Sequence, residues 1–111
     1  MNYHDKKFKV ISNSDNGDVS TEMIFHYQQV GDVLSCKYEG VDIKDGHLIG
    51  TVDEDGSINM RYRQLNGRGE EVSGVCLSKP EIMPNGKIRL HESWRWTSGD
   101  QSTGESILEE V

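Results

Sequence analysis

One short segment holds most of the residues that could do chemistry. It reads Arg89-Leu90-His91-Glu92-Ser93-Trp94-Arg95-Trp96, and its residues alternate in character. Alternate residues of a strand share a face, so Glu92 lies on the face of Trp94 and Trp96. A carboxylate on an apolar face is costly unless it is paired, and burial raises its pKa. We expect Glu92 to be buried or half-buried. It is a polar anchor in a ligand cavity, a general acid or base, a member of a structural ion pair, or a hydrogen-bond partner of Tyr62 or Tyr27. A structural role is favoured over catalysis.

Aromatic residues of other predicted strands can share this face with Glu92. Alternation places Phe25 with Tyr27 in one strand and Tyr62 in another. Sites with a mostly aromatic lining and few polar anchors are typical of small-molecule pockets. No catalytic residue, metal ligand or cofactor is predicted. The predicted ligand-binding residues are Phe25, Tyr27, Tyr62, Glu92, Trp94 and Trp96.

The opposite faces of these strands carry basic residues. They are His26, Arg61, Arg63, His91 and Arg95. If these faces point outward, the side chains are simply solvated. If the interior is polar instead, Arg61, His91 and Arg95 would line an anion site. Alternation alone does not decide between the two, but the tyrosines and tryptophans favour the aromatic face as the core.

Two loops resemble functional motifs. Gln64-Leu65-Asn66-Gly67-Arg68-Gly69 matches Q/R-x-x-G-x-G/A, the acetyl-CoA pyrophosphate loop of the GNAT acetyltransferases. That loop must open a helix, whose N-terminal N–H groups hold the phosphates. The segment from Glu70 to Pro80 contains two valines, an internal Gly and Pro80, which make a poor helix, so an Asn-Gly hairpin is predicted. Ser98–Ser106 contains no G-x-S-x-G elbow and is predicted to be a hairpin loop.

The elements that position these residues are predicted to be strands. Turn signals rich in Gly, Asn and Asp recur at short intervals, and apolar and polar residues alternate between them. No segment shows a helical period with caps. About eight strands are predicted, at Lys7–Ser12, Thr21–Gln29, Val33–Glu39, His47–Asp53, Ser57–Leu65, Glu70–Ser78, Lys87–Thr97 and Glu105–Glu110.

Consecutive hairpins favour an antiparallel up-and-down β-barrel, because closure removes exposed strand edges. A two-sheet β-sandwich is the alternative. Residues 1–111 are expected to form one domain. Gly50 and Gly74, each in mid-strand, predict sharp curvature or close approach of neighbouring groups. Gly40–Lys44 is either an irregular connection or an additional piece of strand.

Composition limits the classes of partner that the protein is expected to bind. The chain has 111 residues and a net charge of −7, which disfavours nucleic acid and anionic membranes. Cys36 and Cys76 belong to no zinc-binding pattern, and a disulfide between them is not favoured. The first residues are polar and form no secretory leader, and no apolar run approaches membrane-spanning length. These features predict a cytoplasmic protein with reduced thiols.

Several stretches together resemble a family of short bacterial proteins that often carry the label N-acetylglutamate synthase or acetyltransferase. They are Met60-Arg61-Tyr62, Pro80-Glu81-Ile82, Arg89-Leu90-His91-Glu92 with Trp94 and Trp96, and Thr97-Ser98-Gly99-Asp100 with Ser102, Gly104, Glu105 and Ser106. The resemblance runs from about Gly17 to Glu110 and implies a lipocalin-like (calycin) barrel. It supplies no catalytic residues. N-acetylglutamate synthases use a longer, mixed α/β domain, which this pattern of strands does not fit.

The leading hypothesis is a non-enzymatic barrel that binds a small, partly apolar ligand. An acyl-CoA-dependent N-acetyltransferase is the second hypothesis, and it requires a helix opening at Gly67. A structural or interaction protein that forms a homodimer through a sheet face is the third.

Overall fold

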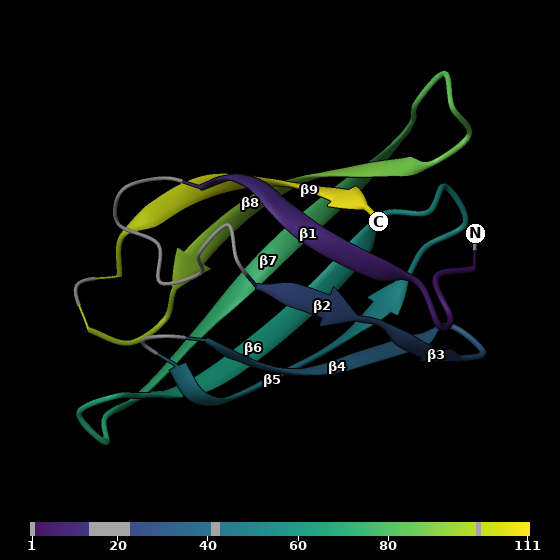
Figure 1. The fold of residues 1–111 in the computed structure, drawn as a ribbon. Coiled ribbons are helices and arrows are strands. Elements are labelled where there is room, and N and C mark those ends of the chain that lie inside the picture. Colours follow the sequence, from purple (N-terminus) through teal and green to yellow (C-terminus); the bar gives the residue numbers. More distant parts are fainter. Residues whose placement is uncertain (1, 14–22, 41–42, 100) are drawn as a thin grey trace.

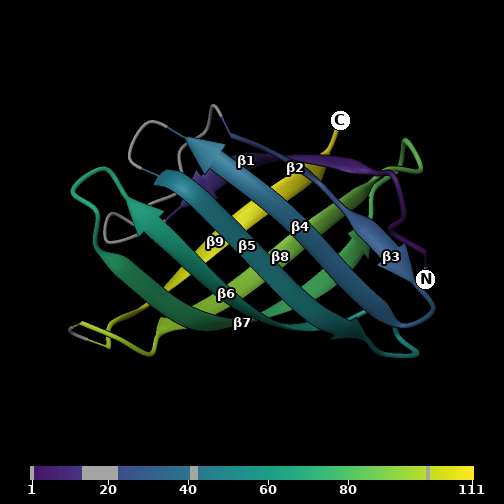
Figure 2. The same ribbon diagram turned by 90° about the horizontal axis from the view of Figure 1, so that it is seen from below.

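The computed structural model describes residues 2–13, 23–40, 43–99 and 101–111, and every element in them is a β-strand. The strands are β1 (Lys7–Asn13), β2 (Ile24–His26), β3 (Gln28–Val30), β4 (Val33–Gly40), β5 (Ile43–Val52), β6 (Ile58–Asn66), β7 (Glu71–Ile82), β8 (Ile88–Trp96) and β9 (Thr103–Glu110). All pair antiparallel, in the order β2-β1-β9-β8-β7-β6-β5-β4-β3. Figures 1 and 2 show this sheet curling into a barrel.

The barrel closes because one chain segment pairs on both sides. β2 pairs with β1, and β3, one residue further along, pairs with β4. Tyr27 lies between them, and its N–H donates to Lys6 O while its carbonyl accepts from Asp5 N, both at 2.9 Å. The two ends of the sheet therefore meet in one segment. This confirms the antiparallel barrel and rules out the two-sheet sandwich.

Three strand boundaries differ from the prediction for physical reasons. The strand expected at Thr21–Gln29 is split at Tyr27, where the chain changes its pairing partner. β5 begins at Ile43 rather than His47, because Ile43 already pairs with both neighbours, and the register against β4 and β6 shifts directly after it. β7 continues through Pro80, although its pairing with β6 stops at the pair Ile58–Ser78. At Pro80 only β8 is paired with β7, and proline is tolerated where a strand has one neighbour.

Four expected segments lie partly outside the described residues. They are the turn at Asn13–Gly17, the first two residues of the strand Thr21–Gln29, the segment Gly40–Lys44 and the loop Ser98–Ser106. No helix in the described ranges has the length and apolarity to cross a membrane.

The interior separates into two halves. In one half, Tyr3 is fully buried, and its hydroxyl donates to Gly56 O at 2.5 Å. The Tyr3 ring packs 6.2 Å from Phe8 and 6.3 Å from Tyr27, measured between ring centroids. Leu34, Ile58 and Leu90 are also fully buried, and they are not among the described residues that line the cavity. The other half contains the cavity described next.

Candidate functional site

A cavity lies inside the barrel and is lined mostly by aromatic and aliphatic side chains. Its volume is about 70 Å³. One water molecule needs roughly 10–15 Å³ of such cavity volume, so the cavity has room for about five waters or a small organic molecule. Its lining comprises Phe25, Tyr27, Tyr38, Leu48, Met60, Tyr62, Gln64, Cys76, Glu92, Trp94, Trp96, Ser106 and Leu108.

All six residues that the sequence singled out lie in this lining. Phe25 belongs to β2, Tyr27 to the switch between β2 and β3, Tyr62 to β6, and Glu92, Trp94 and Trp96 to β8. Alternation on each strand turns them to the same side, and closure brings that side together as the lumen. Their role in binding stays a prediction, but their convergence on one cavity is a feature of the structure.

Glu92 is the carboxyl group of the cavity. It lies in the middle of β8, opposite Ser78 of β7 and Ser106 of β9. The side chain is half-buried, as suits a residue whose remaining surface faces the cavity. Its Oε2 is inaccessible to solvent and makes no hydrogen bond with a described residue. The expected partnership with Tyr62 or Tyr27 through a hydrogen bond is therefore not seen at this atom.

Burial raises the pKa of Glu92 to about 7, and the nearby Ser78 hydroxyl partly offsets the rise. Ser78 Oγ is itself buried without a hydrogen bond of ordinary geometry, so this contact is a weak one. Near neutral pH, comparable fractions of the carboxyl are protonated and ionised. The direction of the shift is the one that the sequence predicted.

Two other ionisable groups of the lining, Tyr27 and Cys76, stay neutral. Burial, with the Glu92 carboxyl beside it, raises the pKa of Tyr27 well above its usual value. The same two causes raise the pKa of the Cys76 thiol. Cys36 and Cys76 are free and buried, and burial raises the pKa of Cys36 to about 11. A thiol must ionise to act as a nucleophile, so these two have a structural role.

The aromatic rings of the lining are held by specific contacts. The indole N–H of Trp94 donates to Ser106 Oγ at 2.9 Å. Trp96 packs nearly edge-on against two rings, at centroid distances of 5.9 Å from Trp94 and 5.3 Å from Tyr62. On β4 and β6, with Gly46 of β5 between them, the hydroxyl of Tyr38 donates to Gln64 Oε1 at 2.9 Å. The rings are thereby fixed before any ligand arrives.

Glycines make room for these rings. Gly74 faces Tyr62 across the β6–β7 ladder, and Gly104 faces Trp94 across the β8–β9 ladder. A Cβ on Gly74 would overlap the Tyr62 hydroxyl end and the Arg95 carbonyl, and a Cβ on Gly104 would overlap the Trp94 ring. The close approach predicted for mid-strand Gly74 is confirmed. Gly104 was expected to lie in a loop and was not predicted to do this.

Several lining residues were missed as site residues. Tyr38, Leu48 and Met60 lie within predicted strands and line the cavity, but they were not predicted to bind a ligand. Gln64 and Ser106 lie within the predicted strands Ser57–Leu65 and Glu105–Glu110, but they were considered only as parts of the two motif-like loops. Both are buried. Applying the alternation to these strand ends would have found both.

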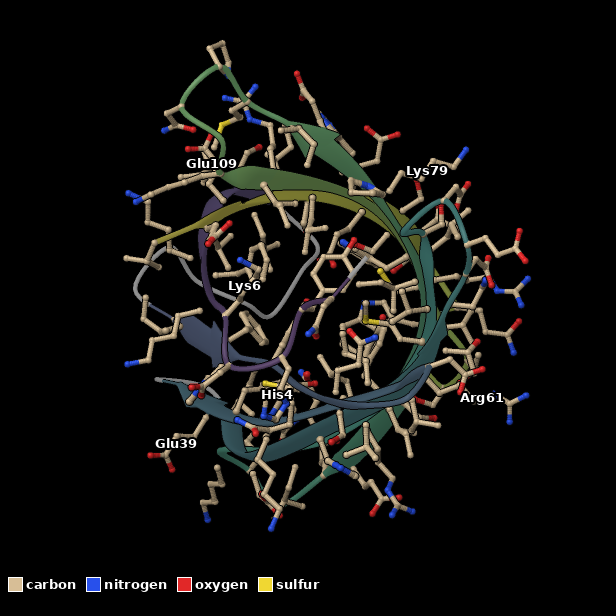
Figure 3. The ribbon with its side chains drawn as sticks, turned by 90° about the vertical axis from the view of Figure 1, so that its right-hand side faces the viewer. His4, Lys6, Glu39, Arg61, Lys79 and Glu109 are labelled. Carbon is tan, nitrogen blue, oxygen red and sulfur yellow. The ribbon has the colours of Figure 1, made fainter. Side chains whose placement is uncertain are left out.

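The basic face lies outside the barrel. Arg61, His91 and Arg95 are exposed, and Figure 3 shows Arg61 projecting from the outer surface. The possibility that they line an internal anion site is therefore wrong. Aromatic side chains fill the interior because their burial is more favourable than that of a guanidinium group.

The segment Gln64–Gly69 ends a strand and makes a hairpin. Asn66 Oδ1 accepts hydrogen bonds from Arg68 N and Glu70 N, both at 3.0 Å, and Gly69 has a φ of 82°. β7 follows at once, with no helix to hold a pyrophosphate. The predicted hairpin is confirmed, and the acetyl-CoA loop has no structural basis here.

Comparison with known proteins agrees with this fold. No solved structure matches the chain. One protein family, described as avidin-like protein, matches it over residues 1–111. This family is of the calycin type, so the expected calycin-like barrel is supported, whereas the N-acetylglutamate synthase label is not. Because the match spans the whole sequence, the chain belongs to the avidin-like protein family.

Proposed function

We propose that this protein is a non-enzymatic barrel that binds a small, partly apolar ligand in its lumen. The observation that carries the proposal is the cavity of about 70 Å³ whose lining combines aromatic rings with one carboxyl group. Small-molecule sites are mostly apolar, with a few polar groups that fix orientation. Membership of the avidin-like family supports a binding role rather than catalysis.

An acyl-transfer function finds no comparable support. It would need an activated nucleophile or base and a cradle for the cofactor phosphates. The buried thiols have raised pKa values, and the Gln64–Gly69 segment forms a hairpin. An interaction role through a homodimer stays a proposal of lower rank, to be read from the same experiment.

Native mass spectrometry of the freshly purified chain tests the proposal. Biotin is the first probe because the family takes its name from avidin, which binds biotin, and acetyl-CoA is the second. We expect a co-purified small molecule that is lost on denaturation, and one added biotin per chain would also support a ligand-binding lumen. An acetyl-CoA adduct would favour the transferase instead. Bare protein in every sample would contradict the proposal, and the masses report the oligomeric state.

Trp96→Ala is the variant that ties binding to the cavity. Trp96 is half-buried and lines the cavity, so its removal deletes ligand contacts without emptying the core. Ile49→Ala is the matched control, because Ile49 is 48% exposed on the outer face of β5. Loss of the bound species in the first variant only is expected. Equal occupancy in both would place the ligand elsewhere.

A further inference from the structure

We propose that the lumen selects a small organic cation, an amine or amidine on an apolar body, whose positive group lies against Glu92 and the surrounding aromatic rings. This inference rests on the proposed function, because it takes the cavity to be a ligand site. It goes further by naming the charge and the chemical class of the ligand.

Glu92 has no positive partner within the described residues. The ion pairs of that part of the chain join other residues, and most lie on its outer surface. The groups packed around Glu92 are Ser78 and Cys76 of β7, Ser106 of β9 and Tyr27 across the lumen. None is a cation, and Tyr27 and Cys76 stay neutral. An ionised Glu92 therefore has no counter-charge among these groups. A cationic ligand could supply one.

The unpaired oxygen of Glu92 points to the same conclusion. Oε2 is buried and accepts no hydrogen bond from a described residue. A buried acceptor without a donor costs free energy, and the cost is greatest when the acceptor is charged. An ammonium or amidinium N–H would provide the donor and the charge together.

The aromatic lining suits a cation as well as an apolar body. The faces of Trp and Tyr rings attract positive charge, and cages of such rings bind organic ammonium ions. Trp94, Trp96 and Tyr62 form a contiguous cluster within the same lining as Glu92. An anionic ligand would meet the opposite conditions, since the described residues of the lining include no Lys, Arg or His and one carboxyl.

Three molecules of the same shape separate the possibilities. Benzamidine is a cation, benzamide is neutral and benzoate is an anion, and each joins one ring to a small planar head. Both tryptophans of the chain line the cavity, so their indole N–H resonances report on its occupancy. At pH 8 we expect benzamidine to bind about tenfold more tightly than benzamide, and benzoate not to bind.

Glu92→Gln keeps the size of the side chain and removes its charge. In this variant we expect benzamidine affinity at pH 8 to fall by about tenfold or more, to the level of benzamide. In the unmodified protein, benzamidine affinity should rise from pH 5 to pH 8 and then level, and the variant should show a flat profile. Glu105→Gln is the control, because it removes one carboxylate from the exposed face of β9.

The outcomes distinguish a failure of the cation preference from a failure of the proposed ligand-binding function. If benzamide binds as tightly as benzamidine, or if benzamidine affinity is unchanged by Glu92→Gln, the cavity binds ligands and the preference for a cation is wrong. If benzoate binds best, the inference is likewise overturned. If none of the three shifts an indole resonance and native mass spectra show bare protein, the proposed function fails with it.

Discussion

Glu92 ionises at a cost, because its carboxyl lies among aromatic and aliphatic side chains inside the barrel. An ordinary glutamate has a pKa near 4.5, whereas burial raises that of Glu92 to about 7. Between these two values the folded chain holds a proton that the unfolded chain has released. The free energy of unfolding therefore falls as pH rises from 4.5 to 7, and the full penalty remains above pH 7.

The first prediction follows from this fall in the free energy of unfolding with rising pH. A rise of about 2.5 pKa units corresponds to about 3 kcal/mol. Glu92→Gln should be more stable than the unmodified protein by about this amount at pH 8 and nearly equal to it at pH 4.5. Urea unfolding at the two pH values measures the difference. Glu105→Gln, on the outer face, should show no such pH-dependent gain, and parallel curves for all three proteins would contradict the argument.

Ser106 supports a ring rather than a charge. Its hydroxyl accepts the indole N–H of Trp94 at 2.9 Å, and both residues are buried. Ser106→Ala leaves that donor without its acceptor, so we predict a loss of about 1–3 kcal/mol in the free energy of unfolding. The indole N–H resonance of Trp94 should shift while that of Trp96 moves less. Ser93→Ala, exposed on the same strand as Trp94, is the control and should leave both nearly unchanged.

At the scale of the elements, pairs of strands position the aromatic rings by leaving glycine opposite them. Gly104 lies directly across the β8–β9 ladder from Trp94. Gly104→Ala would push a methyl group into that ring, so we predict a loss of about 1–3 kcal/mol in stability and weaker ligand binding in the cavity. Urea unfolding and the Trp94 indole resonance are the measurements.

Gly67→Ala is the matched control for that substitution. Gly67 lies in the turn between β6 and β7, and nothing lies within 4 Å of the position of its added Cβ. It should change stability little. A comparable loss in both variants would mean that chain flexibility, and not contact with Trp94, explains the effect.

The strands show why part of the site could be predicted from the sequence. Alternation alone places Tyr62, Trp94 and Trp96 on one face, and the structure brings them to one cavity. Long-range pairing is not encoded so locally. The switch of partner at Tyr27 depends on β1 and β4 meeting the same segment, and Gly104 gains its role only from the register between β8 and β9.

The basic face shows a second limit of what the sequence can predict. A period of two assigns residues to faces but does not say which face becomes the interior. Arg61 and Tyr62 alternate equally well, and closure around the aromatic side decides the matter. The free volume inside depends on how all the side chains pack together, which no single strand specifies.

For the whole molecule, the chief asymmetry is between a filled half and a half with a cavity. Tyr3, which precedes the first strand, fills the interior near the hairpin between β5 and β6 and donates to Gly56 O. Its ring also packs on Phe8 and Tyr27, where the barrel closes. A residue outside the strands thus stabilises both the filled half and the closure of the sheet.

Two substitutions of Tyr3 separate these contributions. Tyr3→Phe removes the hydroxyl and leaves the Gly56 carbonyl without that donor, so we predict a loss of about 1 kcal/mol in the free energy of unfolding. Tyr3→Ala also removes the fully buried ring, and a loss of about 3–5 kcal/mol is expected from the cavity it leaves. Urea unfolding measures both. Because Tyr3 does not line the ligand cavity, Tyr3→Phe should keep the ligand affinity of the unmodified protein. A loss of ligand binding without a loss of stability would show that the two halves are coupled, because Tyr27 packs on Tyr3 and also lines the cavity.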